Sequence, residues 1–226
     1  MRQSHSRPAW TRHFVRRSER VRTTWKFRIA LVVLIVGLGS LTSDWWTVVV
    51  GRSLLCERDI APADGILLEN FNPEYLLFER AADLRRRGIA PTVFVPIRVG
   101  ADRRLDAVTW ATAKVMAELA QLDQMEAIPV REVEPISLNA ARDIQRYLGQ
   151  KNVRSVVVVS PLFRSRRSVL VYQATLGRQG IAVGCEPVRG TMGVDSWTRT
   201  WHGVQGVMEQ WLKLQYYRFY VLPFYS

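Results

Sequence analysis

Short apolar runs alternate with longer segments of helical periodicity from residue 63 onward. Five of these runs have the length and composition of buried strands, and they span 65–69, 92–95, 127–130, 156–159 and 181–185. The fourth is a run of consecutive valines, and an apolar run bounded by turn residues is typical of a central strand in a parallel sheet. The pattern predicts an α/β fold, with a mostly parallel sheet of about five strands and helices on both faces.

The segments between the predicted strands have helical spacing. Asn72 and Pro73 suit the N-cap and first position of one helix, and Gly88 suits its end. A later helix begins at Ser137 or Asn139. The predicted helices cover 74–87, 105–122, 137–150 and 166–176. In such sheets ligands bind beyond the carboxyl ends of the strands, so the residues that follow each strand are the first candidates for a site.

Large apolar residues recur at alternating spacings near the C-terminus. They are Trp197, Trp201, Val204, Met208 and Trp211. This spacing predicts an amphipathic aromatic helix, and the tail that follows it adds tyrosine and phenylalanine. Two interpretations stay open. The apolar face packs in the core of the domain, or it lies against a membrane, where Trp and Tyr side chains are well accommodated.

The N-terminal part of the chain combines a basic arm with an apolar segment. Residues 2–28 hold eight arginines and Lys26 against the single acid Glu19, and the apolar segment follows at 29–50. A bilayer-spanning helix needs about 20 apolar residues, and arginines mark its cytoplasmic flank. We therefore expect one transmembrane helix over 29–50, with the N-terminus in the cytoplasm. The alternatives are a cleaved signal peptide and a buried helix of a soluble protein.

Charge is distributed unevenly along the 226 residues. The net charge is +12, but the chain after residue 28 carries 23 basic and 19 acidic side chains. The body is therefore only mildly basic, and we expect no nucleic-acid partner, although a basic arm alone can bind RNA or DNA. The predicted organisation is a cytoplasmic arm at 1–28, an anchor at 29–50, a connector at 51–62 and an α/β domain at 63–226.

Cysteine and histidine usage limits the possible chemistry. The two cysteines, Cys56 and Cys185, are candidates for a disulfide if the domain faces an oxidising compartment, and core packing is the alternative. The three histidines are scattered, and no CxxC or other metal-ligand spacing occurs. We therefore expect no metal site and no Ser-His-Asp triad.

A candidate anion site follows the valine strand. The sequence RSVVVVSPLFRSRR over 154–167 places Ser160 at the strand end and Arg164, Arg166 and Arg167 at the start of a helix. Positive side chains are unfavourable there unless something offsets them, because the helix dipole already places positive charge at its N-terminus. An anion held between the helix N-terminus and the arginines would do so. Solvation or pairing with nearby carboxylates is the alternative.

Other polar residues follow the remaining strands. Asn70, Asn72, Arg98 and Asn139 are further candidate ligand-binding residues, and the asparagines also suit turns and caps. Glu132 and Glu134 are a possible catalytic pair or partners of the arginines. The sequence lacks GxGxxG, GxxxxGK[ST] and GxSxG, which disfavours a dinucleotide oxidoreductase, a P-loop NTPase and a serine hydrolase. No cofactor is indicated, and the catalytic residues, if any, stay unassigned.

Several of these segments together resemble the YdcF-like family, which includes the envelope proteins SanA and ElyC. The similarity covers about residues 63–188, and its best parts are AADLRRRGIAP at 81–91, SLNAARDI at 137–144 and VVVVSPLFRSRRSVLVY at 156–172. Ser160, Arg166 and Arg167 match the family pattern, and Arg164 stands where the family has histidine. The glycines that usually follow the first two strands are replaced here by Glu69-Asn70-Phe71 and Val95-Pro96-Ile97.

The resemblance implies a Rossmann-like fold, one membrane helix and a domain outside the cytoplasm at the bacterial inner membrane. It also implies involvement in envelope integrity or peptidoglycan-related metabolism, and one branch of the family is associated with S-adenosylmethionine. Three hypotheses follow. The protein binds an anionic, phosphorylated or lipid-linked envelope metabolite; it is a non-catalytic scaffold for envelope proteins; or it is a transferase-like enzyme that uses Glu132 or Glu134.

Overall fold

The computed structural model describes residues 24–57, 62–69, 71, 74–100 and 104–225. The chain divides into two compact units, Met1–Ser43 and Asp44–Ser226. In the first unit, helix α2 (Trp25–Leu41) begins after Thr24, whose hydroxyl oxygen accepts a hydrogen bond from Phe27 N. None of its residues is buried. Among the described residues no single helix is long and apolar enough to cross a membrane, although α2 and α3 (Ser43–Ser53) reach that length and composition as a bent pair.

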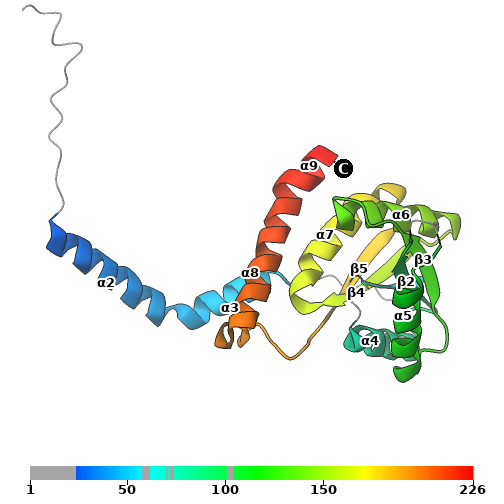
Figure 1. Ribbon diagram of the computed structural model, residues 1–226, viewed down its shortest axis with the longest axis horizontal. Helices are drawn as coiled ribbons and strands as arrows, with labels where there is room; N and C mark the ends of the chain where they lie inside the picture. Colours follow the sequence, from blue (N-terminus) through cyan, green and yellow to red (C-terminus); the bar gives the residue numbers. More distant parts are fainter. Residues whose placement is uncertain (1–23, 58–61, 70, 72–73, 101–103, 226) are drawn as a thin grey trace, which may run out of the picture. The chain divides into compact units, whose positions relative to one another are not determined.

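The second unit is built on a parallel sheet (Figure 1). The five strands are β1 (Gly65–Leu68), β2 (Thr92–Arg98), β3 (Glu126–Val130), β4 (Ser155–Pro161) and β5 (Ala182–Val188). Their order in the sheet is β3-β2-β1-β4-β5, which is the order of a Rossmann-like sheet. The predicted parallel α/β fold is therefore confirmed, and the order reverses between β1 and β4.

Helices cover both faces of this sheet. Helices α4 (Tyr75–Arg86) and α5 (Ala107–Leu119) share one core with Ile66 and Leu68 of β1. Helices α6 (Ile136–Gln150) and α7 (Ser165–Thr175) share the other core with Leu67. Because side chains alternate between the faces of a strand, consecutive residues of β1 supply two separate cores, and all of them are buried.

The observed helix ends follow local capping. Gly88 comes just after α4 with φ of +74°, as expected for a residue that ends a helix. Helix α5 is shorter than the predicted 105–122, because the carboxylate of Asp106 caps its first turn by accepting a hydrogen bond of 2.7 Å from Thr109 N. The predicted cap Asn72 and first residue Pro73 of α4 lie outside the described residues.

Helix α3 belongs to the second unit from Asp44 onward. The indole Nε1 of Trp197 donates a hydrogen bond of 3.0 Å to Thr47 O, and Leu54 is buried in a cluster with Trp197. The segment that we expected to form the end of an anchor and a connector therefore packs, in part, as an element of the α/β unit.

The C-terminal segment has a turn at Trp197–Arg199, helix α8 (Trp201–Tyr216), a π-helical turn at Tyr217–Val221 and helix α9 (Leu222–Tyr225). Trp197 is buried, but Trp201 and Met208 are 74% and 43% exposed, so core packing of the whole predicted stripe is wrong. Val204 and Trp211 of the stripe are partly buried and pack in the cluster of Trp197, together with the buried Val207 and Leu214. Periodicity located the packed face only in part, because α8 carries apolar residues on two sides.

Candidate anion site at the carboxyl ends of β1 and β4

The point where the strand order reverses brings Glu69 and Ser160 to one edge of the sheet. Strands β1 and β4 pair in register, with Leu68 opposite Val159. Glu69 N continues this pairing and donates a hydrogen bond of 2.9 Å to Val159 O. Glu69 is 2% exposed and Ser160 is completely buried. The predicted first strand ends at Glu69 and so places it at this edge, but Glu69 was not among the predicted ligand-binding residues.

The three arginines before and within α7 have different surroundings. Arg167 is 7% exposed, Arg164 is half-buried and Arg166 is exposed. Arg167 donates through Nη1 to Ser137 Oγ at 2.8 Å, and its guanidinium lies over the Tyr217 ring at 5.5 Å from the centroid. A helix turns by about 100° per residue, so consecutive side chains cannot point to the same place. The expectation that all three arginines share one site is therefore wrong for Arg166.

The N-terminus of α7 is covered by the segment after α3. Arg166 N donates a hydrogen bond of 3.0 Å to Leu54 O, and Ser165 Oγ accepts one of 3.1 Å from Cys56 N. In the structure Cys56 forms a disulfide with Cys185 of β5, with Cα atoms 6.4 Å apart. The predicted placement of an anion against the backbone of this helix end does not fit, because Leu54 already occupies the Arg166 N–H.

Glu69 lies beside Ser168 and within the field of two arginines. Ser168 Oγ is 2.5 Å from Glu69 Oε2 and 3.1 Å from Arg164 O. Burial raises the pKa of Glu69 above its ordinary value, while the positive charges of Arg164 and Arg167 act against that rise. Burial also lowers the pKa of Arg167. Ser168 Oγ donates to Glu69 Oε2, and this hydrogen bond also acts against the rise in the pKa of Glu69.

Three buried polar atoms have no hydrogen-bond partner within the described part of the chain. They are Ser160 Oγ, Arg164 Nε and Arg167 Nε. All three belong to the end of β4 and the start of α7. Unpaired buried polar groups are rare in native proteins, and each costs about 1–3 kcal/mol. Two donors of guanidinium type and one hydroxyl group are therefore available to a ligand.

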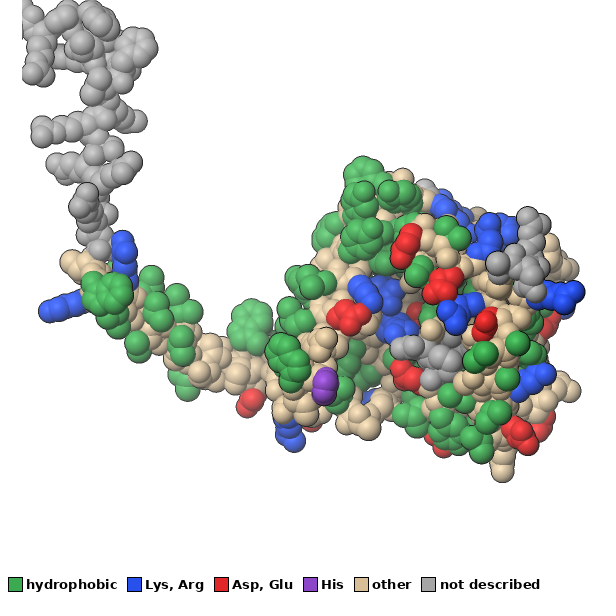
Figure 2. All heavy atoms as spheres, viewed as in Figure 1, with side chains coloured by type: hydrophobic (Ala, Val, Ile, Leu, Met, Phe, Trp, Pro, Cys, Tyr) green, Lys and Arg blue, Asp and Glu red, His purple; other side chains and the backbone are tan. Residues whose placement is uncertain are grey.

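A cleft of about 360 Å³ opens beside Arg164. Its lining includes Pro161 and Val188 at the ends of β4 and β5, Gly206 and Gln210 of α8, and Glu74, which directly precedes α4. Figure 2 shows basic and acidic side chains interspersed on the face of the α/β unit in view, next to the hydrophobic side chains of the C-terminal helix. The volume is within the usual range of small-molecule sites, about 300–1,000 Å³.

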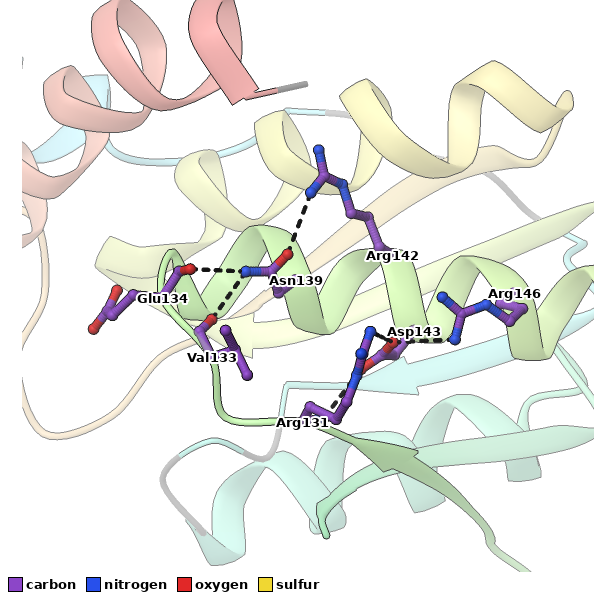
Figure 3. A network of polar contacts seen from close by, with 7 residues as sticks. All are labelled: Arg131, Val133, Glu134, Asn139, Arg142, Asp143 and Arg146. Carbon is purple, nitrogen blue, oxygen red and sulfur yellow. Dashed lines mark hydrogen bonds and ion pairs between the residues drawn. The ribbon is translucent and has the colours of Figure 1, made fainter. Parts of the chain in front are cut away.

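The other predicted residues lie beyond β2 and β3, where they make contacts within the fold. Arg98, at the end of β2, pairs with Glu132 at 3.0 Å rather than joining Arg164, and both side chains are half-exposed. Asn139 Nδ2 donates to Val133 O at 3.1 Å and to Glu134 O at 3.0 Å, so it holds the loop before α6 (Figure 3). Glu132 and Glu134 thus show no arrangement that supports a catalytic pair.

Asp143 of α6 is the centre of a second charged cluster, which Figure 3 also shows. Its carboxylate accepts hydrogen bonds from Arg131 N at 3.0 Å and from Arg131 Nη2 at 2.8 Å, and Arg146 adds an ion pair at 3.3 Å. Burial alone would raise the pKa of Asp143, but the hydrogen bonds from Arg131 outweigh it and the pKa is lowered. This cluster joins the end of β3 to α6.

Two predicted ligand residues, Asn70 and Asn72, lie outside the described residues. Within the described residues no group of three or more potential metal ligands occurs. No family model matches the chain, and no curated protein or solved structure matches it. The residues at the β1/β4 edge are therefore the basis for any inference about its chemistry. Because arginine side chains stay protonated, they favour anion binding over proton transfer.

Proposed function

We propose that this protein is a membrane-anchored, YdcF-like protein of the bacterial envelope that binds an anionic metabolite at the β1/β4 edge. The observation that carries the proposal is the set of unpartnered buried atoms Ser160 Oγ, Arg164 Nε and Arg167 Nε. They lie where the strand order reverses, which is the usual ligand position in open α/β sheets. The resemblance of the strand and helix around them to YdcF-like proteins supports the same site.

The charge balance of the site favours an anionic ligand. Arg164 and Arg167 share Glu69 as a nearby carboxyl group, and burial raises the pKa of that group. Among the described residues neither Arg164 nor Arg167 forms an ion pair, although Glu209 lies within the field of both. A phosphate or carboxylate would accept charge-assisted hydrogen bonds from the guanidinium groups, each contributing about 1.5–3 kcal/mol.

The ligand class we propose is a phosphorylated or lipid-linked compound. Arginine binds phosphate and carboxylate through paired donors, so the site suits either anion. The cleft beside Arg164 also offers apolar surface from Leu162, Phe163 and Val207, against which an uncharged part of the ligand would pack. A second function, a scaffold for envelope proteins, is favoured by one separate observation, the exposed aromatic side chains of α8 and α9.

Paired substitutions of neighbouring arginines test the binding site. Arg164→Gln should weaken binding of inorganic pyrophosphate by about 10–100-fold, because it removes a half-buried charged donor. Arg166→Gln is the matched control, since this side chain is exposed and its backbone N–H is already bound to Leu54 O. Calorimetry on the full-length protein measures both. Equal losses in the two variants, or no pyrophosphate binding by the unsubstituted protein, would contradict the proposal.

We place the α/β unit outside the cytoplasm, at the inner membrane, with a cytoplasmic N-terminus. The Cys56–Cys185 disulfide supports this location because disulfides persist in oxidising compartments. The arginines before the apolar segment support the orientation. A reporter fused after Ser226, active on only one side of the membrane, tests it. A signal from the cytoplasm would overturn the orientation and return cytosolic nucleotides to the possible ligands.

A further inference from the structure

The C-terminal helices expose an unusual number of large apolar side chains. We call this surface the aromatic face, and its exposed fractions range from 43% to 74%. It consists of Trp201, Met208, Leu212, Tyr216, Phe219, Tyr220, Phe224 and Tyr225. Figure 2 shows hydrophobic side chains along the C-terminal helix. A contiguous exposed patch of this kind marks an interaction surface more often than a free one.

The π-helical turn keeps the aromatic side chains together. Tyr216 and Tyr220 stack with ring centroids 5.4 Å apart, and Tyr220 approaches Phe224 at 5.6 Å. The wider turn at Tyr217–Val221 holds more residues than an α-helical turn, which changes the direction of the side chains that follow it. The result is a ladder of rings on the outer side of the helix.

The inner side of the same helices is already packed. Val207 and Leu214 are buried on α8, and Tyr217 and Val221 are buried on the π-helical turn. These residues pack against the core that α6 and α7 cover, and against the cluster around Trp197. Because the inner apolar side of these helices packs within the domain, only a second apolar environment can remove the aromatic face from water.

The position of α3 indicates which environment this is. Thr47 of α3 accepts the hydrogen bond of Trp197, and Val50 packs in the cluster that also contains Val207. Helix α3 exposes Trp45 and Trp46, and in the chain it directly follows α2, where no residue is buried. The α/β unit therefore begins with an element that carries interfacial residue types, and this element is fixed to the start of the C-terminal helices.

We propose that the aromatic face lies in the interfacial layer of a lipid bilayer. Tyr and Trp rings favour this layer because they are apolar with one polar atom, and basic side chains among them favour anionic headgroups. Arg218 supplies such a charge, with its guanidinium 5.5 Å from the centroid of the Phe219 ring. The proposal rests on the membrane anchor of the proposed function and adds a second contact to it.

This contact would determine where the cleft opens. Helix α8 carries the aromatic face on its outer side and contributes Gly206 and Gln210 to the cleft. A helix with its side chains is about 10–12 Å across. A bilayer-bound aromatic face would therefore hold the cleft and Arg164 close to the membrane surface.

Site-specific photo-crosslinking in vesicles tests the proposal without disturbing the fold. The full-length protein is reconstituted into phosphatidylethanolamine–phosphatidylglycerol vesicles with benzoylphenylalanine at a single position. Leu212 and Phe219, which are 59% and 67% exposed, report on the aromatic face. Leu119 of α5 is the matched control, because it is also 67% exposed but belongs to a helix on the other face of the sheet. Val33 of α2 reports on the anchor.

We expect several-fold more lipid adduct at positions 212 and 219 than at position 119. Adducts to a second copy of the chain at 212 and 219, or lipid adducts no more abundant than at 119, would overturn the proposal. If lipid adducts form at 33 but not at 212 and 219, the anchor is supported and the proposed bilayer contact of the aromatic face is wrong. If they form at 212 and 219 but not at 33, the membrane contact stands and the proposed anchor fails.

Discussion

Arginine side chains lie at the carboxyl edge of the sheet both beyond β3 and beyond β4, but their hydrogen bonding differs. Beyond β3, Asp143 of α6 accepts hydrogen bonds from Arg131, which join the end of β3 to α6, and Arg146 of the same helix adds an ion pair. Beyond β4, Arg164 and Arg167 are more buried, yet each leaves its Nε without a partner among the described residues. Both sides are rich in arginine, and they differ in whether the charge is satisfied.

The difference separates arginines whose donors are used within the fold from buried arginines that keep a free donor. A guanidinium that already makes its hydrogen bonds gains little from a ligand, because binding only exchanges one partner for another. A buried guanidinium with a free donor has more to gain, since the desolvation cost has already been met by folding. Three substitutions test this distinction.

The largest effect on stability is expected for Asp143→Asn. This change removes a buried carboxylate that accepts hydrogen bonds from Arg131 N and from two nitrogen atoms of the Arg131 side chain. Loss of these bonds should lower the free energy of unfolding by about 2–3 kcal/mol, measured by urea denaturation. Pyrophosphate binding should stay within about two-fold, because the residue lies on the structural side of the comparison.

The pH dependence sharpens this first prediction. The pKa of Asp143 is lowered in the folded protein from its ordinary 3.8, so its stabilisation is present above that pH and is lost as the pH falls through the folded value. The difference between the unsubstituted protein and Asp143→Asn should therefore shrink below about pH 4. A difference that stays constant down to pH 2 would show that the carboxylate charge is not responsible.

A smaller effect, on binding rather than stability, is expected for Glu69→Gln. The variant removes the buried carboxyl group near Arg164 and Arg167 that would compete with an anion, and it leaves Glu74 in the lining of the cleft and Glu209 within the field of both arginines. Where Glu69 of the unsubstituted protein is charged, pyrophosphate should bind the variant roughly ten-fold more tightly, from the loss of a charge repulsion of about 1–3 kcal/mol at short range. The gain should shrink as the pH falls, because protonation neutralises Glu69. A gain that does not change with pH would contradict the role of this proton.

The contribution of Glu69 to the free energy of unfolding should change with pH in the opposite direction to that of Asp143. Its folded pKa is raised above the ordinary 4.5, so the folded state holds the proton more tightly and loses stability as the pH rises through the folded value. The free energy of unfolding should therefore fall with rising pH in the unsubstituted protein relative to Glu69→Gln.

The smallest effect is expected for Glu132→Gln. The Arg98–Glu132 pair is 3.0 Å long, and both side chains are about half-exposed. Exposed pairs contribute about 0–1 kcal/mol, so the variant should be nearly as stable as the unsubstituted protein and should bind pyrophosphate equally well. A large loss of pyrophosphate binding would indicate that the ligand site lies on the β2/β3 side, which would contradict the comparison.

Much of the fold could be predicted from local pattern. The five strands, the helices between them and the end of α4 at Gly88 follow from apolar periodicity and turn residues, which act over a few positions. Strand ends were less accurate, since β2 and β4 continue beyond the predicted 92–95 and 156–159. The packed face of α8 was predicted only in part: Val204 and Trp211 pack, whereas Trp201 and Met208 are exposed, because the helix carries apolar residues on two sides.

The candidate site was predictable only in part. Ser160, Arg164 and Arg167 follow from the position of a strand end before an arginine-rich helix. Arg166 was grouped with them, because its exposure depends on what packs against α7. Arg98 and Asn139 have structural partners that no sequence spacing identifies, Glu132 for the first and the backbone before α6 for the second.

The sequence by itself determined the class of fold and the residue types at the carboxyl edge. Only the tertiary structure decided that β1 lies beside β4, and this places Glu69 among residues almost a hundred positions away. It also decided that Leu54 covers the N-terminus of α7 and that Cys56 meets Cys185. The physical reason is that strand order and burial are set by packing between distant segments, and a side chain's charge state and free donors depend on that packing.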